Sequence, residues 1–262
     1  MPTADTPLRF VSNPISHYCE KARWALDRAE VPYVEEHHLP LFSRAAAKRA
    51  VGTPTVPALA GEGMKLGESN DIVRWVDAQL VEDARWLSSV GEEQADLDAY
   101  VERFDRELGP HVRRWCFDQV LPERELVQKI FEGQGPAWER RALRWTYPVA
   151  TSFLKKSLKV SPESVQRSIA KIDACLDVAE ARLAEGRSFL VAERLTGADV
   201  GLAVFLAPIV MPAEHPSDYV TYESVPPAYR RRCDELRARP VGEYVLRLYA
   251  EHRAERAPRL DA

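Results

Sequence analysis

The chain has 262 residues, of which 45% are hydrophobic and 29% are charged. This composition is ordinary for a globular protein that buries one large core or two smaller ones. The net charge of -4 excludes a strong global attraction to nucleic acid or to an anionic membrane surface, so we expect neither as a partner.

The cysteines lie too far apart in the sequence to suggest a disulfide framework or a metal-binding cluster. They are Cys19, Cys116, Cys175 and Cys233. The N-terminal residues are polar and lack the apolar stretch of a signal peptide. The most apolar run, residues 200–212, is too short and too proline-broken to span a bilayer. We therefore expect a cytoplasmic protein that binds no metal ion.

The first eighty residues mix strand and helix patterns. Alternating or short apolar runs between turn residues predict strands, and apolar residues at helical spacing predict helices. In chain order these patterns predict a strand at 8–12, a helix at 17–29, a strand at 31–38, a helix at 43–50, strands at 55–60 and 63–67, and a helix at 69–80. The predicted order is β-α-β-α-β-β-α.

Strand patterns stop after residue 80, and long helical patterns follow a linker at about 81–90. Helices are expected at 91–119, 122–132, 163–185, 197–209, 226–236 and 240–253. The segment 133–162 is rich in aromatic and basic residues and gives no clear prediction. The sequence therefore predicts an α+β protein, with one domain at 1–82 and an all-helical domain at 91–255.

Three short motifs stand at junctions of the predicted elements. SHYCEKARWAL (16–26) opens the first helix, GTPTVPAL (52–59) leads into the third strand, and ESNDIVRWV (68–76) opens the last helix of the first domain. With this order of motifs and elements, the chain resembles the soluble glutathione transferase superfamily over nearly its whole length. The resemblance implies a thioredoxin-like first domain that binds glutathione as a co-substrate.

The resemblance also implies roles for individual residues. Ser16 matches the serine of serine-type transferases, which stands where the first strand feeds the first helix. Val56, held before a cis Pro57, would pair with the peptide backbone of glutathione. Glu68 and Ser69 would hold the γ-glutamyl end, and Ser69 is also an N-cap candidate for the helix that follows.

A serine at a helix start suits the activation of a thiol. The thiolate is the nucleophilic form, and an unperturbed thiol has a pKa of about 8.5. A helix N-terminus carries unsatisfied N–H groups and a partial positive charge, which favour an anion. Lowering the thiol pKa by about two units requires about 2.7 kcal/mol. A charge-assisted hydrogen bond together with the helix dipole is of that order.

Other interpretations of these residues stay open at this stage. From the local residues alone, Ser16 is explained as a plain helix N-cap, which is the commonest role of a serine at a helix start. Cys19 is an inert residue of the helix, or it is the catalytic thiol of a glutaredoxin-like reductase. With Ser16 in the place of a first cysteine, a dithiol cycle is not available. Tyr18 falls inside the predicted helix and is interpreted as a packing residue.

Two further patterns favour structural roles. His37 and His38 are adjacent on a strand and so point to opposite faces, which predicts a solvated strand end rather than a metal site. Thr196 and Asp199 have the spacing of a capping box at the start of the helix that follows them.

The leading functional expectation is a transferase that activates the glutathione thiolate for attack on a hydrophobic electrophile or peroxide, as in detoxification. The alternatives are a ligand-binding protein that has lost turnover, and the reductase that uses Cys19. The helical domain would supply an apolar pocket for the hydrophobic partner. Its wall candidates are Phe104, Trp115, Phe117 and Trp145. A homodimer is expected from the resemblance.

Overall fold

The computed structural model describes residues 6–61, 63–217 and 220–257. The chain forms two compact units, and each unit is made of more than one stretch of the sequence. The first unit contains the described residues of 1–85, 128–146 and 254–262, and the second contains 86–127 and 147–253. The segment 128–146 therefore belongs to the first unit, although its neighbours in sequence are helices of the second.

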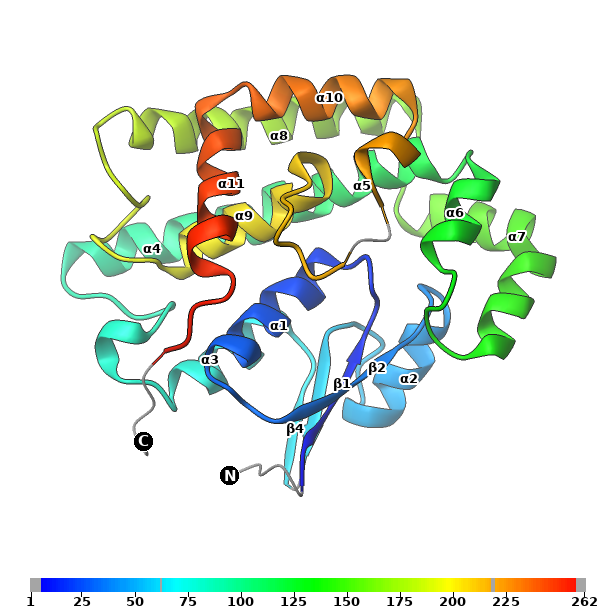
Figure 1. Ribbon diagram of the computed structural model, residues 1–262, viewed down its shortest axis with the longest axis horizontal. Helices are drawn as coiled ribbons and strands as arrows, with labels where there is room; N and C mark the ends of the chain where they lie inside the picture. The colour runs from blue at the N-terminus through cyan, green and yellow to red at the C-terminus, as the bar shows by residue number, and fades with distance from the viewer. Residues whose placement is uncertain (1–5, 62, 218–219, 258–262) are drawn as a thin grey trace. The chain divides into compact units, whose positions relative to one another are not determined.

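The first unit is built on a four-stranded mixed sheet with the strand order β2-β1-β3-β4 (Figure 1). β1 pairs with β2 in parallel, and β3 is antiparallel to both β1 and β4. The strands are β1 (Leu8–Ser12), β2 (Tyr33–His37), β3 (Ala58–Gly61) and β4 (Met64–Leu66). In the parallel register Ser12, the last residue of β1, lies opposite His37, the last residue of β2.

Three helices cover this sheet. They are α1 (His17–Arg28), α2 (Phe42–Val51) and α3 (Ser69–Asp77). α1 and α3 pack against each other on one face, and α2 packs against β1 and β3 on the other (Figure 1). A short 3₁₀ helix, η1 (Glu82–Ala84), follows α3 inside the expected linker.

The β-α-β-α-β-β-α order predicted from the sequence is confirmed. The clearest difference is at β3, which begins at Ala58 rather than at residue 55. The delay has a physical cause, because Pro57 has no N–H to donate to a strand ladder. The Val56-Pro57 peptide bond is cis, as the resemblance implied.

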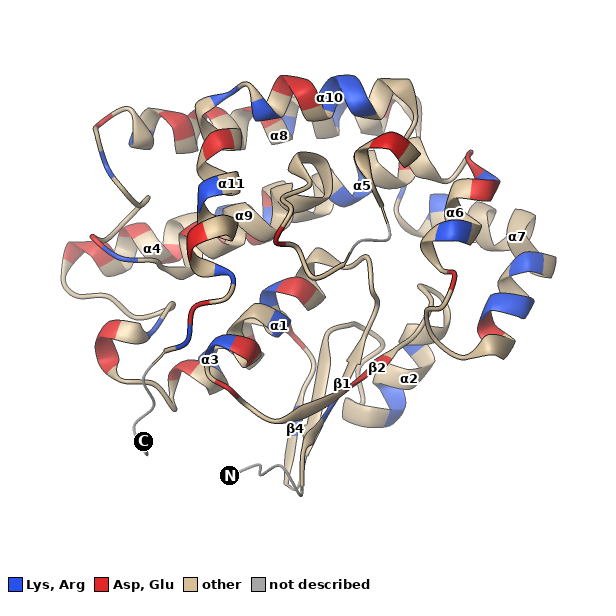
Figure 2. Cartoon of the chain, viewed as in Figure 1, with Lys and Arg blue, Asp and Glu red and all other residues tan. Residues whose placement is uncertain are grey.

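Within the described residues, the rest of the chain contains helices and no strand. They are α4 (Glu92–Arg103), the π-helix η2 (Phe104–Leu108), α5 (Gly109–Val120), α6 (Arg124–Ile130), α7 (Ala137–Ser157), α8 (Pro162–Leu183), α9 (Gly197–Val210), the 3₁₀ helix η3 (Tyr222–Ser224), α10 (Pro227–Arg237) and α11 (Pro240–His252). The helix expected at 91–119 is thus two α-helices joined by the π-helix. The segment without a prediction contains α7, whose first turns carry much of the positive charge seen there in Figure 2.

α9 is the centre of the second unit. It is buried along its length except at Pro208, and it packs against α4, α5, α10 and α11. The predicted capping box is present at its start, where the Thr196 N–H donates to Asp199 Oδ2 at 2.8 Å. No helix of the described residues has both the length and the apolar composition needed to cross a membrane.

Candidate functional site

Ser16 is the N-cap of α1. Its backbone is extended (φ -85°, ψ 115°), its carbonyl accepts from Glu20 N–H at 3.0 Å, and its Oγ accepts from Cys19 N–H at 3.4 Å. The side chain is half-buried. Because Oγ accepts in the capping bond, that bond does not use the hydroxyl proton. The geometry therefore allows Ser16 to cap the helix and to donate to an anion at the same time.

Asn13 shapes the turn that presents Ser16, a role that the sequence analysis did not assign to it. Its Oδ1 accepts from Ile15 N–H at 3.2 Å, and its carbonyl accepts from Ser16 N–H at 3.0 Å. An Asn side chain that bonds the backbone two residues ahead is an Asx turn. An Asn-Pro pair directly before a predicted helix was the available signal.

Cys19 lies in the first turn of α1, but its side chain is fully buried. Burial raises the pKa of its thiol to about 11, against the smaller effect of hydrogen bonds from Asn13 and Ser16. The Asn13 N–H lies 3.5 Å from the sulfur. A nucleophilic cysteine needs a depressed pKa and access to solvent. This environment offers neither.

Tyr18 lies inside α1, as expected, and makes an edge contact with the His17 ring at 4.8 Å between centroids.

The second and third motifs come together in the fold. Thr55 Oγ1 lies 3.2 Å from the Gly67 carbonyl oxygen and 3.5 Å from Glu68 Oε1. Val56 is half-buried and packs against the cluster that includes Val11 and Ala58. The loop before the cis proline is thereby held beside the start of α3.

Glu68, not Ser69, is the N-cap of α3. Its backbone is extended (φ -129°, ψ 143°), its carbonyl accepts from Ile72 N–H at 3.1 Å, and its side chain is exposed. Ser69 is the first helical residue and is buried. The prediction of Ser69 as N-cap was wrong by one position. The Glu68 side chain makes no capping hydrogen bond, and its Oε1 lies 3.5 Å from Thr55 Oγ1 instead.

A layer of buried charge runs from α1 to β2, and the sequence analysis missed it. Arg23 bonds Glu20 at 2.5 Å and Glu35 at 2.5 and 3.1 Å, and only 6% of Arg23 is exposed. Burial alone would raise the pKa of Glu35, but hydrogen bonds from His37 and Arg23 outweigh it and lower the pKa to about 2. Glu20 and Arg23 stand at the i, i+3 spacing of a helical ion pair, which was the available signal.

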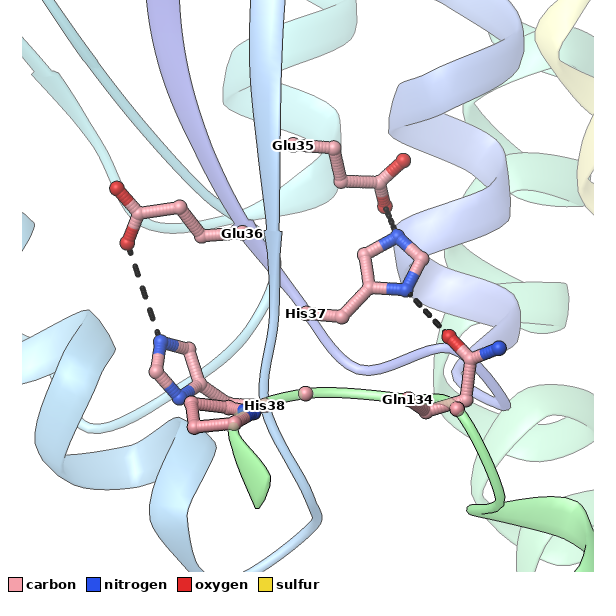
Figure 3. Close-up of a pocket in the computed structure, with 8 residues that line it drawn as sticks. Glu35, Glu36, His37, His38 and Gln134 are labelled. Atoms are coloured by element: carbon pink, nitrogen blue, oxygen red, sulfur yellow. Dashed lines mark hydrogen bonds and ion pairs between the residues drawn. The ribbon is translucent and has the colours of Figure 1, made fainter. Parts of the chain in front are cut away.

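His37 and His38 do point to opposite sides of β2, as Figure 3 shows. The expectation of a solvated strand end was wrong, because both side chains are half-buried against residues 133–139. A cavity of about 530 Å³ lies there, lined by residues 35–38 and 133–136. Among residues 6–61, 63–217 and 220–257, no group of three or more His, Cys, Asp or Glu could hold a metal ion.

The four aromatic residues that the sequence suggested as the lining of an apolar pocket have different surroundings. Phe104 and Trp115 are buried within the second unit, where the Trp115 ring packs at a tilt of 57° against Tyr229, with 4.7 Å between ring centroids. Phe117 is half-buried, and Trp145 is 82% exposed. Phe104 and Trp115 are therefore core residues of their unit.

A mixed thioredoxin-like sheet with a cis proline before its third strand, followed by a helical unit, defines the class of two-domain glutathione transferases. The family model described as glutathione S-transferase, N-terminal domain, matches residues 10–83. The model described as glutathione S-transferase, C-terminal domain, matches residues 162–231. The chain belongs to the glutathione S-transferase superfamily.

Solved structures share this fold. Glutathione transferase F2 from Populus trichocarpa is 19% identical, with a TM-score of 0.52 over 93% of this chain and 99% of that chain. The β-etherase LigF from Sphingobium sp. strain SYK-6 is 17% identical, with a TM-score of 0.57 over 92% and 98%. Ure2p5 from Phanerochaete chrysosporium, cocrystallized with 1-(S-glutathionyl)-2,4-dinitrobenzene, is 16% identical, with a TM-score of 0.55 over 94% and 96%. A search of curated proteins found no match.

Proposed function

We propose that the protein is a glutathione transferase in which Ser16 holds the glutathione thiolate at the start of α1. The observation that carries the proposal is the Ser16 hydroxyl itself, which caps the helix through its oxygen. Its proton can therefore be donated to a sulfur anion beside the helix N-terminus. In the reaction the thiolate sulfur forms a bond to an electrophilic carbon, the leaving group departs with the electron pair, and the thiol proton passes to solvent.

The surrounding motifs would hold the rest of glutathione. The backbone of Val56, before the cis proline, would pair with the cysteinyl part of the peptide. Glu68 and the start of α3 at Ser69 would bind the γ-glutamyl end, because a carboxylate suits a helix N-terminus and an ammonium group suits Glu68. Thr55 links the two sets through its contact near Glu68.

The environment of Cys19 disfavours the reductase alternative. Its thiol is buried and has a raised pKa, so the protonated form predominates at neutral pH. We therefore propose Ser16 rather than Cys19 as the working residue. A homodimer and a cytoplasmic location remain predictions, and light scattering at twice the chain mass of 29.6 kDa would support the dimer.

The test combines binding and turnover. Isothermal titration with glutathione measures affinity, and a panel of aromatic halides, organic peroxides and ethers measures activity. Ethers are included because one of the similar structures is a β-etherase.

We expect Ser16→Ala to keep glutathione affinity and to lose turnover, and Cys19→Ala to keep both. Glutathione binding with no turnover on the whole panel would favour a binding protein. Loss of turnover in Cys19→Ala alone would make Cys19 the catalytic residue.

A further inference from the structure

Most of the large apolar side chains that stay exposed in the described residues lie on one helix, α7. They are between 51% and 82% exposed, and they are Trp138, Trp145, Val149 and Phe153. The other exposed side chains of this kind, Val34 and Val90, are on other parts of the chain. Single exposed apolar residues are normal on a protein surface, but a contiguous group of them marks an interaction site.

The four side chains form one stripe along α7. Trp145, Val149 and Phe153 follow each other at four-residue spacing, and Trp138 precedes Trp145 by seven residues. Residues four or seven positions apart lie on the same side of an α-helix. From Trp138 to Phe153 the stripe runs about 22 Å along the helix axis. An edge contact between the Trp138 and Phe42 rings, with 5.0 Å between centroids, fixes one end of the stripe.

The fold holds α7 by its other side. The residues there recur at three- or four-residue spacing and are buried, and they are Glu139, Leu143, Tyr147 and Ala150. Both polar members are hydrogen-bonded. Glu139 Oε2 accepts from Leu39 N–H at 2.9 Å, and the Tyr147 hydroxyl donates to the Leu121 carbonyl at 2.7 Å. The apolar stripe is therefore on the solvent side of the helix.

The exposed charges beside the stripe are all positive. α7 contains one acidic residue, Glu139, whose side chain is fully buried on the packed side. The exposed charged residues of the helix are Arg141, Arg144, Lys155 and Lys156, and Figure 2 shows the positive residues of α7 in blue. The next acidic residue after Glu139 is Glu163, beyond the end of the helix. The chain as a whole has a net charge of -4, so this face has the opposite sign to the molecule.

We propose that this face of α7 binds the surface of a membrane that contains anionic lipids. The helix lies in the plane of the surface, and its apolar stripe enters the boundary between headgroups and acyl chains. The stems of the Arg and Lys side chains follow the apolar surface while their charged ends reach the lipid phosphates. Trp138 and Trp145 suit this position, because tryptophan rings are enriched at membrane–water interfaces.

The charge of this face favours lipid over a second copy of the chain. In a twofold dimer the same patch meets itself, so the exposed cations of one copy would face those of the other. Like charges brought together in an interface are unfavourable. An anionic lipid surface instead offers a phosphate to every basic side chain. The expectation that the chain binds no membrane came from its net charge, which does not describe this face.

The attachment does not depend on the proposed function, because none of its residues belongs to the candidate glutathione site. Loss of membrane binding would leave the assignment of Ser16 as it stands, and loss of turnover in Ser16→Ala would leave the attachment as it stands.

Cosedimentation with sucrose-loaded vesicles tests the binding. The full chain is mixed with vesicles of phosphatidylcholine alone, and with vesicles of equal parts phosphatidylcholine and phosphatidylserine. We expect a partition coefficient at least about tenfold higher on the anionic vesicles, because each Lys or Arg near an anionic surface contributes about fivefold. The binding should weaken as salt is added, since salt screens exposed charges. An equal partition coefficient on the two kinds of vesicle would overturn the proposal.

Two pairs of variants test the stripe and the charges separately. Trp145→Gln should lower the partition coefficient on anionic vesicles about tenfold, whereas Val90→Gln, an exposed apolar position outside α7, should leave it unchanged. Arg141→Gln should lower it about fivefold, whereas Arg231→Gln, an exposed position of α10, should not. All four positions are exposed, so we expect unchanged circular dichroism spectra. If both α7 variants bind vesicles as the wild type does, the proposal is wrong.

The other occupants of this face have their own signatures, and each would overturn the proposal. A second copy would appear in analytical ultracentrifugation without lipid as a dimer that Trp145→Gln dissociates. Absence of binding to either kind of vesicle would exclude a lipid surface. Binding to immobilised polyglutamate that Arg141→Gln weakens would then indicate an acidic protein as the partner.

Discussion

At the scale of single residues, the proposed chemistry depends on one hydroxyl that has two tasks. Ser16 caps α1 through its oxygen, so removing the hydroxyl takes away both a cap and a donor to an anion. These two losses have different signatures, because a lost cap lowers stability and a lost donor changes the pH dependence of turnover.

Ser16→Ala should lower the rate about 10- to 150-fold, as expected for the loss of a hydrogen bond to a charged group worth about 1.5 to 3 kcal/mol. The ascending limb of the pH–rate profile should also move to higher pH, because the bound thiol then keeps its proton more tightly. The control is Ser161→Ala, which removes a cap of the same kind from α8, where Ser161 accepts from Ser164 N–H. It should cost about 1 kcal/mol of stability and leave the pH limb unchanged. An unmoved limb in Ser16→Ala would contradict the proposed role.

The thiols give a second prediction at this scale. Burial raises the pKa to about 11 for Cys19, Cys175 and Cys233, and to about 12 for Cys116. Because these values lie well above pH 8, all four side chains stay protonated there. A thiol-specific disulfide reagent at pH 8 should react slowly with the native protein and quickly with four thiols after denaturation. One thiol that reacts rapidly in the native protein would contradict the raised pKa of that cysteine, and mass spectrometry would identify it.

At the scale of elements, the best-supported helix start is that of α9. Asp199 is buried and accepts from Thr196 N–H and Leu190 N–H, both at 2.8 Å, and from the Tyr244 hydroxyl at 2.6 Å. The sequence predicted the first of these bonds from the i, i+3 spacing. The other two come from residues distant in sequence and required the fold.

Asp199→Ala should therefore cost more than a lost cap. It leaves four donors without their acceptor, because the Thr196 hydroxyl also donates to Asp199. Each unsatisfied buried group costs about 1–3 kcal/mol. We expect a loss of about 3 kcal/mol or more in the free energy of unfolding, measured by urea titration. Asp98→Ala, on the exposed side of α4, should change stability by less than about 0.5 kcal/mol. An equal decrease in the free energy of unfolding in both variants would show that the hydrogen bonds of Asp199 do not stabilise the fold more than an exposed aspartate does.

The predictable and unpredictable parts of the fold differ in the range of the interactions involved. The elements of the first domain and most later helices follow from local periodicity and turn residues, and the start of β3 could have been placed by the missing N–H of Pro57. The placement of Ser69 failed by one residue because an extended Glu68 and an extended Ser69 are equally compatible with the sequence. The contact of residues 128–146 with the end of β2 was not predicted, since His38 and Glu139, which make it, are 101 residues apart and carry no local pattern.

At the scale of the whole molecule, the candidate glutathione residues belong to one compact unit. Ser16, Val56, Glu68 and Ser69 all lie within residues 1–85, and residues 128–146 belong to the same unit. A ligand held by these residues stabilises the native state of this unit by mass action, because it does not bind the unfolded chain.

Glutathione should therefore raise the stability of the protein in a concentration-dependent way. At a free concentration of 100 times the Kd, binding to the native state contributes about 2.7 kcal/mol. For a chain of this size the thermal midpoint should rise by about 5 to 10 °C, measured by scanning calorimetry or a fluorescent dye.

Ser16→Ala should keep this rise, because the hydroxyl acts on the thiolate and not on the peptide. Glu68→Gln should reduce it, because the partner of the γ-glutamyl ammonium loses its charge, while the exposed Glu132→Gln should not. Hydrogen exchange should show the added protection in residues 6–61 and 63–85. No rise with millimolar glutathione, or an equal rise in Glu68→Gln, would contradict the binding site proposed here.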